Sequence, residues 1–141
     1  MINQDRNSLR QVFFDAWSKA HQSQILTPLE QVIVAIIRLH PEYHPLLSNQ
    51  NKNLHRDFTP EQGETNPFLH MSMHIAIHEQ LTTQRPEGIV EIYQSLVNKS
   101  VDAHQAEHRI MECLGQMLWQ AQQNNAEPDE VAYLECLKKL G

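Results

Sequence analysis

The chain has 141 residues, of which 40% are hydrophobic, and a formal net charge of −6 with histidine neutral. This length is sufficient to bury a core, so we expect one helical domain over residues 1–141. Its 11 lysines and arginines are scattered and outnumbered by 17 acidic residues, which excludes a basic face for nucleic acid. The apolar run 32–37 is too short to span a bilayer, and residues 1–10 lack the pattern of a secretion signal. We therefore expect a cytoplasmic protein that binds neither nucleic acid nor membrane.

The two cysteines, Cys113 and Cys136, form no CxxC pair. A reducing compartment keeps such residues as thiols, and buried cysteine usually behaves as a small hydrophobic side chain. We therefore expect two separate structural thiols.

Helical periodicity is clear in the first forty residues. The first predicted helix covers about residues 6–22, with an apolar face formed by Leu9, Val12, Phe13, Ala16 and Trp17. A second start follows, because Thr27, Pro28 and Glu30 combine an N-cap, a proline at the first helical position and a carboxylate at the third. This helix is predicted to end near Leu39, before Pro41.

Residues 40–45, HPEYHP, predict a turn or a single helical turn. The polar stretch 48–65 has no periodicity and is predicted to form a long loop. Such a loop is either a functional lid or a solvated excursion without a role, and Leu54 and Phe58 offer apolar side chains that could hold it against the core.

Four more helices follow in the pattern. Asn66 and Pro67 open one that reaches about Gln84, and a second is marked by the apolar positions between residues 89 and 97. Asp102, with Gln105 three residues later, resembles a capping box and opens a helix to about residue 123. A short helix after Pro128 closes the chain. With no competing strand pattern, the fold class is all-α, a bundle of about five to six helices.

Histidine spacing carries the chemical information. The nine histidines outnumber the five lysines, and four pairs stand at i, i+4, where two imidazoles share one helix face. These pairs are His40/His44, His70/His74, His74/His78 and His104/His108.

Several of these polar residues interrupt apolar stripes, so they are predicted to face the core. The predicted metal ligands are His70, His74, His104, Glu107 and His108. A buried carboxylate such as Glu107 needs a cation or strong donors nearby. Imidazoles and carboxylates without thiolates suit a divalent transition metal, namely Zn, Fe or Mn.

Further residues are candidates for additional ligands or for groups that orient a ligand ring. They are His40, His44, Glu79 and Glu112. Each histidine also has a structural interpretation, since a ring hydrogen-bonded to the backbone needs no metal. For His40 a position at a helix C-terminus favours that interpretation. His78 lies beyond the edge of its stripe and is left outside the ligand set.

The segments HPEYH, NPFLHMSMHIAIHEQ, DAHQAEHRIMECLGQMLWQAQ and PDEVAYLECLKKL resemble a bacterial family known as domain of unknown function 1841. The resemblance covers most of the chain from Thr27 onward. It implies a bacterial source and brings no activity with it.

Two functional hypotheses follow. In the first, the His/Glu cluster binds a transition metal for metal-assisted hydrolytic or redox chemistry, and Glu107 or Glu112 moves protons. In the second, the histidines form a metal-free buried network in a helical interaction module, whose exposed face binds a protein partner or a second copy of the chain. No substrate is indicated by the sequence.

Overall fold

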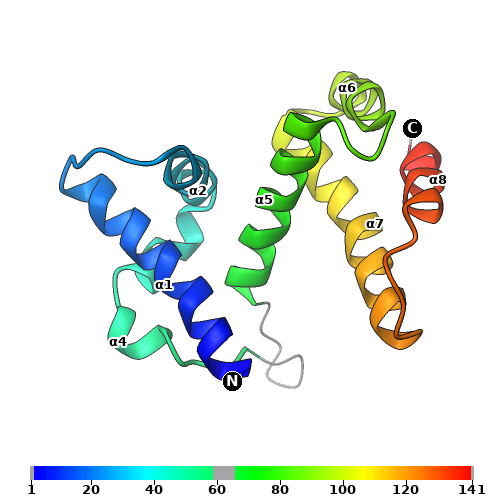
Figure 1. The fold of residues 1–141 in the computed structure, drawn as a ribbon. Coiled ribbons are helices and arrows are strands. Elements are labelled where there is room, and N and C mark those ends of the chain that lie inside the picture. Colours follow the sequence, from blue (N-terminus) through cyan, green and yellow to red (C-terminus); the bar gives the residue numbers. More distant parts are fainter. Residues whose placement is uncertain (1, 59–65, 141) are drawn as a thin grey trace. The chain divides into compact units, whose positions relative to one another are not determined.

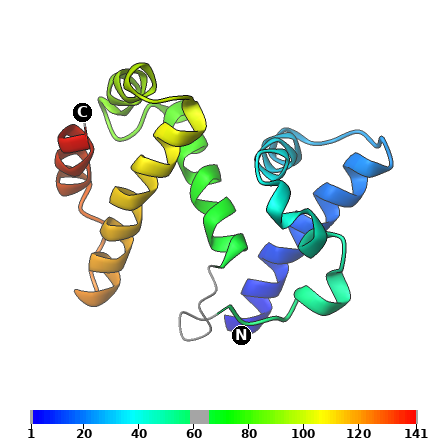
Figure 2. The ribbon, with the colours of Figure 1, turned by 180° about the vertical axis from the view of Figure 1, so that it is seen from behind.

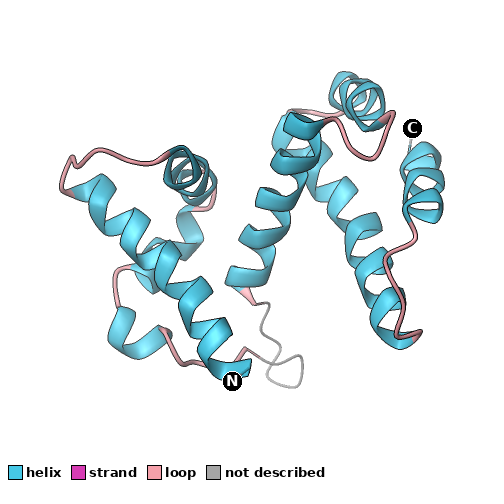
Figure 3. Ribbon diagram, in the orientation of Figure 1, coloured by secondary structure: helices cyan, strands magenta, loops and turns pink. Residues whose placement is uncertain are grey.

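The computed structural model describes residues 2–58 and 66–140 of the chain. Figure 3 shows helices joined by loops, and no strand occurs in these two ranges. The all-α prediction is confirmed. No described helix is both long and apolar enough to cross a membrane.

Contacts divide the chain into two compact units, residues 1–75 and 76–141. The first unit holds α1 (Ile2–His21), α2 (Pro28–Arg38), the 3-10 helix η1 (Pro41–Tyr43), α3 (His44–Leu47), α4 (Gln50–Asn53) and the start of α5 (Pro67–Thr83). The second holds the end of α5, α6 (Ile89–Lys99), α7 (Ala103–Gln123) and α8 (Glu130–Leu140) (Figure 1). The single helical domain expected over residues 1–141 stays a prediction.

In the first unit, α1 packs against α2, as both ribbon views show (Figures 1 and 2). The core between them contains Phe13, Phe14, Trp17, Ile33 and Ile37, all less than a tenth exposed. The predicted apolar face of α1 is partly wrong. Leu9 and Val12 are exposed, and the buried face passes instead through Arg10 and Phe14, because the helix is rotated toward α2 and the start of α5.

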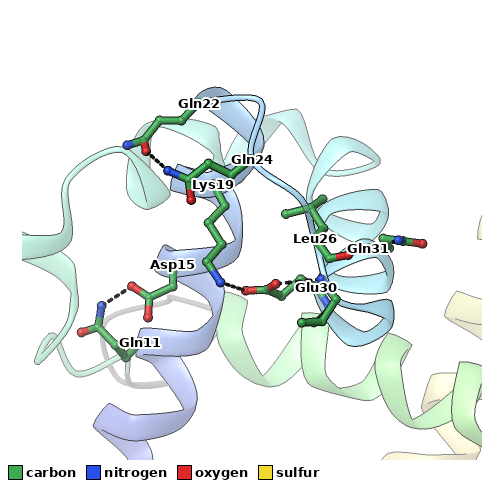
Figure 4. Close-up of polar contacts among 9 residues, drawn as sticks. Gln11, Asp15, Lys19, Gln22, Gln24, Leu26, Glu30 and Gln31 are labelled. Carbon is green, nitrogen blue, oxygen red and sulfur yellow. Dashed lines mark hydrogen bonds and ion pairs between the residues drawn. The ribbon is translucent and has the colours of Figure 1, made fainter.

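The start of α2 shows the predicted capping box. The Glu30 amide donates to Thr27 Oγ1 (3.2 Å), and the Thr27 amide donates to Glu30 Oε1 (2.9 Å). Figure 4 shows that Lys19 of α1 donates to the other carboxylate oxygen of Glu30, at 2.8 Å. One carboxylate therefore caps α2 and joins it to α1. The hydrogen bond from Lys19, followed by the one from the Thr27 amide, lowers the pKa of Glu30.

Arg10 is a buried cation in the first unit, only 2% exposed. Its Nη1 donates to the carbonyl oxygens of Leu54 (3.1 Å) and Arg56 (2.6 Å). Its Cζ lies 4.8 Å from the ring centroid of Phe68 and 5.6 Å from that of Phe58. These contacts tie the segment after α4 to α1 and α5, and they replace the water that burial removes from the guanidinium.

The long loop predicted over residues 48–65 is wrong in its first part. Residues 50–53 form α4, because Asn49 accepts a hydrogen bond from an amide in the first turn and caps it. Asn53 is buried and donates to the Leu46 and Asn49 carbonyls. Residues 59–65 of the predicted loop lie outside the described residues.

In the second unit, α7 packs against α6 and α8. Leu96, Ile110, Leu114, Tyr133 and Leu137 form the buried interior of these three helices. The Tyr133 hydroxyl donates to Gln80 Oε1 of α5, at 2.9 Å. This hydrogen bond satisfies the polar end of a side chain that is 1% exposed.

Cys113 of α7 and Cys136 of α8 form a disulfide, with Cα atoms 5.8 Å apart. The expectation of two separate thiols is therefore wrong. The packing of α8 against α7 brings together two residues that are 23 positions apart in the sequence, and no local spacing rule reports such a pair.

Replacing Arg10 by methionine is expected to lower the free energy of unfolding by about 2–4 kcal/mol, because the partly buried carbonyls of Leu54 and Arg56 lose this donor. Urea unfolding followed by circular dichroism measures this change. Arg38→Met, at an exposed position in the last turn of α2, should stay within about 0.5 kcal/mol of wild type. Equal stability of Arg10→Met and wild type would contradict the anchoring role of the guanidinium.

The lowered pKa of Glu30 predicts a pH dependence of stability. A carboxyl group with a folded pKa below its unfolded value stabilises the fold above the unfolded pKa, about 4.3, and loses this contribution as the pH falls through the folded pKa. Urea unfolding between pH 7 and pH 2 should therefore show a smaller acid loss in Glu30→Gln than in wild type. Lys19→Met, which removes the largest cause of the shift, should reduce the loss as well. An unchanged acid profile in both variants contradicts this prediction.

Candidate functional site

Three histidines of the first unit form a group that we call the His40 group: His40, His70 and His74. The ring centroids are 5.0 Å apart for His40 and His70, 4.9 Å for His40 and His74, and 5.1 Å for His70 and His74. His40 and His74 are 2% and 1% exposed, and each offers a ring nitrogen within 4.8 Å of the other. Two predicted ligands, His70 and His74, and the additional candidate His40 are thus in mutual contact.

The orientation of His40 is set by the end of α2. Its Nδ1 donates to the Ile36 carbonyl at 2.8 Å, and Tyr43 stacks on its ring at a centroid distance of 5.3 Å and an angle of 9°. Because a carbonyl only accepts, Nδ1 carries a proton, and in the neutral ring the lone pair is on Nε2. Metal-ligating histidines in proteins are commonly oriented by such a bond. Burial, followed by the charge of Glu42, raises the pKa of Tyr43.

His44, the other additional candidate in this region, faces different neighbours. Its Nε2 donates to the Ile37 carbonyl at 2.9 Å, and its ring centroid lies 4.7 Å from that of Trp17. In the neutral ring the lone pair is therefore on Nδ1. A role of His44 as a ligand stays a prediction.

In the second unit, His104 and His108 lie one turn apart near the start of α7. Their Nε2 atoms face each other at 2.8 Å, so one nitrogen donates and the other accepts. With metal–nitrogen bonds of about 2.0–2.1 Å, this separation corresponds to an angle of about 90° at the ion. The pair therefore has the spacing of two neighbouring ligands of one ion.

The cap of α7 differs in part from the predicted capping box. Asp102 accepts from the Gln105 amide at 2.8 Å, as predicted. The Gln105 side chain accepts from the amide of Val101, at 2.8 Å, and not from that of Asp102. Asp102 therefore caps α7 two residues before His104.

Glu107 is 6% exposed, and its predicted burial is confirmed. Its Oε1 lies 3.8 Å from Nε2 of His78, which is ion-pair reach but longer than a hydrogen bond. Burial, followed by the charge of Glu107, raises the pKa of Tyr93 of α6. Sequence reasoning left out His78, although its i+4 spacing from His74 was available as a signal.

Glu79 and Glu112 are exposed. Glu79 lines a surface pocket of about 330 Å3 together with Arg85 and Tyr133. The roles of Glu79 and Glu112 in orienting a ligand ring stay predictions.

In the part of the chain that the structure describes, the protein is all-helical, with the His40 group in the first unit and the His104–His108 pair in the second. A family model described as "Domain of unknown function (DUF1841)" matches residues 5–139, so the chain belongs to this family. The family resemblance identified in the sequence is confirmed. No curated protein and no solved structure matches the chain.

The hydrogen bonds of His40 and His44 predict opposite tautomers in the metal-free protein. His40 should carry its proton on Nδ1 and His44 on Nε2, because each of these nitrogens donates to a carbonyl. Long-range nitrogen–proton NMR of 15N-histidine-labelled protein at about pH 8, above the ordinary histidine pKa, distinguishes the two forms. His40→Ala and His44→Ala identify the signals. Finding the same tautomer at both positions contradicts the prediction.

Proposed function

We propose that this protein binds a divalent transition metal ion, Zn, Fe or Mn, through histidine nitrogens. The proposed ligands are His70, His74, His104, Glu107 and His108, with His40 as an additional one. The observation that carries the proposal is the 2.8 Å separation of the His104 and His108 Nε2 atoms.

The chemistry of the donor set supports the same proposal. The His40 group and the His104–His108 pair supply imidazoles, and Glu107 supplies a buried carboxylate. Zn, Fe and Mn accept such a mixture of nitrogen and oxygen donors. Both cysteines are engaged in the disulfide, so thiolate ligands are outside this set.

The proposed chemistry is metal-assisted hydrolysis or redox chemistry. A bound ion of this kind supplies a Lewis acid that polarises an oxygen or lowers the pKa of water. We propose that Glu107, where it is not itself a ligand, or otherwise Glu112 accepts and releases protons. Glu107 is a buried carboxylate whose Oε1 lies 3.8 Å from Nε2 of His78. His40, held by the Ile36 carbonyl, would present Nε2 in a fixed direction.

A metal-free interaction module is the competing function, and one observation favours it. Rings of His40 and His44 already donate to backbone carbonyls, as they would in a structural network. In that case the protein would act by binding a protein partner or a second copy of itself. We propose a cytoplasmic location under either function, and no role in nucleic-acid binding, which a net charge of −6 disfavours.

Metal analysis of protein purified without a His tag distinguishes these functions. The metal-binding protein should contain about one or two equivalents of a transition metal per chain. Chelation should lower the melting temperature, because an ion that binds only the native state adds about 2.7 kcal/mol at a hundredfold excess over its dissociation constant. This difference should fade as the pH falls through about 6.5, because protons then compete for the imidazoles.

Matched variants test the residues. His74→Ala and His108→Ala should each reduce the bound metal and the chelator sensitivity of the melting temperature. His21→Ala, at the exposed end of α1, should leave both unchanged. Trace metal in wild type, together with identical melting of wild type and His108→Ala with and without chelator, would establish the metal-free module instead.

A further inference from the structure

The disulfide between α7 and α8 borders a surface pocket of about 320 Å3. Cys113, Cys136, Tyr133, Glu135 and Lys139 are among the residues that line it. We propose that this disulfide is a thiol-exchange site, at which a small thiol enters the pocket and attacks Sγ of Cys136. The proposal is independent of metal binding.

The two cysteines differ in burial. Cys113 is 2% exposed in the core of the second unit, whereas Cys136 is partly exposed on α8. Thiol–disulfide exchange requires the attacking thiolate to reach one sulfur, so access selects the sulfur that is attacked. The structure therefore favours Cys136 as the attacked residue and Cys113 as the leaving group.

Charged side chains that line the pocket also affect the exchange. Lys139 lies three residues after Cys136 on α8 and lines the same pocket. A nearby ammonium group favours a thiolate over a thiol in the incoming reagent, and it stabilises the Cys136 thiolate that leaves in the second displacement. In the first displacement this stabilisation alone would favour Cys136 as the leaving group, so the choice of Cys136 as the attacked residue rests on access. Glu135 also lines the pocket and opposes this effect, so the contribution of Lys139 has to be measured by variants. The neighbouring Lys138 borders a different pocket and supplies a matched control.

Reduction by a monothiol proceeds in two balanced displacements. The first thiolate attacks Cys136 Sγ, the protein S–S bond breaks, and the Cys113 sulfur leaves as a thiolate and takes up a proton. A second thiolate attacks the reagent sulfur of the mixed disulfide, which releases the Cys136 thiolate and the oxidised reagent. Two electrons pass from the two thiols to the protein, and the oxidised form returns by the reverse exchange.

The expected consequence is a looser α8, since without the crosslink this helix of 11 residues is held on α6 and α7 by noncovalent contacts alone. Tyr133 and Leu137 are its two buried side chains. The Tyr133 hydroxyl bonds Gln80, and the Leu140 carbonyl accepts from Arg109. An isolated helix of this length is marginal in water, so loss of the crosslink should increase local opening while α6 and α7 remain folded.

The test uses the full-length oxidised protein and 2-mercaptoethanol as the probe thiol, under native conditions. After brief exposure, free thiols are alkylated and the modified peptides are identified by mass spectrometry. We expect the mixed disulfide on Cys136 and the alkyl group on Cys113. A mixed disulfide on Cys113, equal modification of both, or reduction only after denaturation would overturn the proposal.

The lysine variants and hydrogen exchange complete the test. Lys139→Gln should slow the initial exchange by about threefold, as expected for one surface charge, and Lys138→Gln should leave the rate unchanged. Equal rates in the two variants remove the role assigned to Lys139. After full reduction, amides of residues 130–140 should exchange faster and those of residues 89–99 should keep their protection. Unchanged exchange in α8 would refute the loosening of this helix.

Discussion

A polar group that leaves water must recover the hydrogen bonds it loses, and both units are organised by this constraint. In the first unit, Arg10 donates to the carbonyls of Leu54 and Arg56 in the segment after α4. In the second unit, the Tyr133 hydroxyl donates a hydrogen bond to Gln80 Oε1. Burial raises the pKa of Tyr133 to about 12, so the hydroxyl keeps its proton and remains a donor. In each case a side chain of one helix donates a hydrogen bond to an acceptor that is distant in sequence.

The same constraint gives the histidines their chemical character. At the end of α2 the Ile36 carbonyl accepts from the Leu39 amide and also from the His40 ring. That bond decides which ring nitrogen has the lone pair in the neutral form. His104 and His108 instead face each other, so their arrangement depends on a proton or an ion between two nitrogens. The same geometry therefore fits a hydrogen-bonded network and a set of metal ligands. The two differ in whether a proton or a metal ion lies between the nitrogens.

The disulfide adds a covalent connection to the noncovalent packing of α8 against α6 and α7. α8 buries two side chains, and its link to α7 through Cys113 and Cys136 restricts how far it can move. A cytosolic disulfide is usually transient, whereas one in an oxidising compartment persists. Its response to thiols therefore bears on where the protein works as well as on how α8 is held.

The sequence by itself determined the helical class and the starts of capped helices such as α2 and α7, because capping and periodicity act within a few residues. Thr27 with Glu30 is the clearest case, and the shared face of His70 and His74 follows from the same helical geometry. The start of α4 was missed, although Asn49 caps it. Only the tertiary structure decided which faces are buried and which distant groups meet. Arg10 reaches a carbonyl 44 residues away, and the cysteines pair across 23 positions. Such contacts depend on how helices pack against each other, and a periodicity of 3.6 residues does not specify that packing.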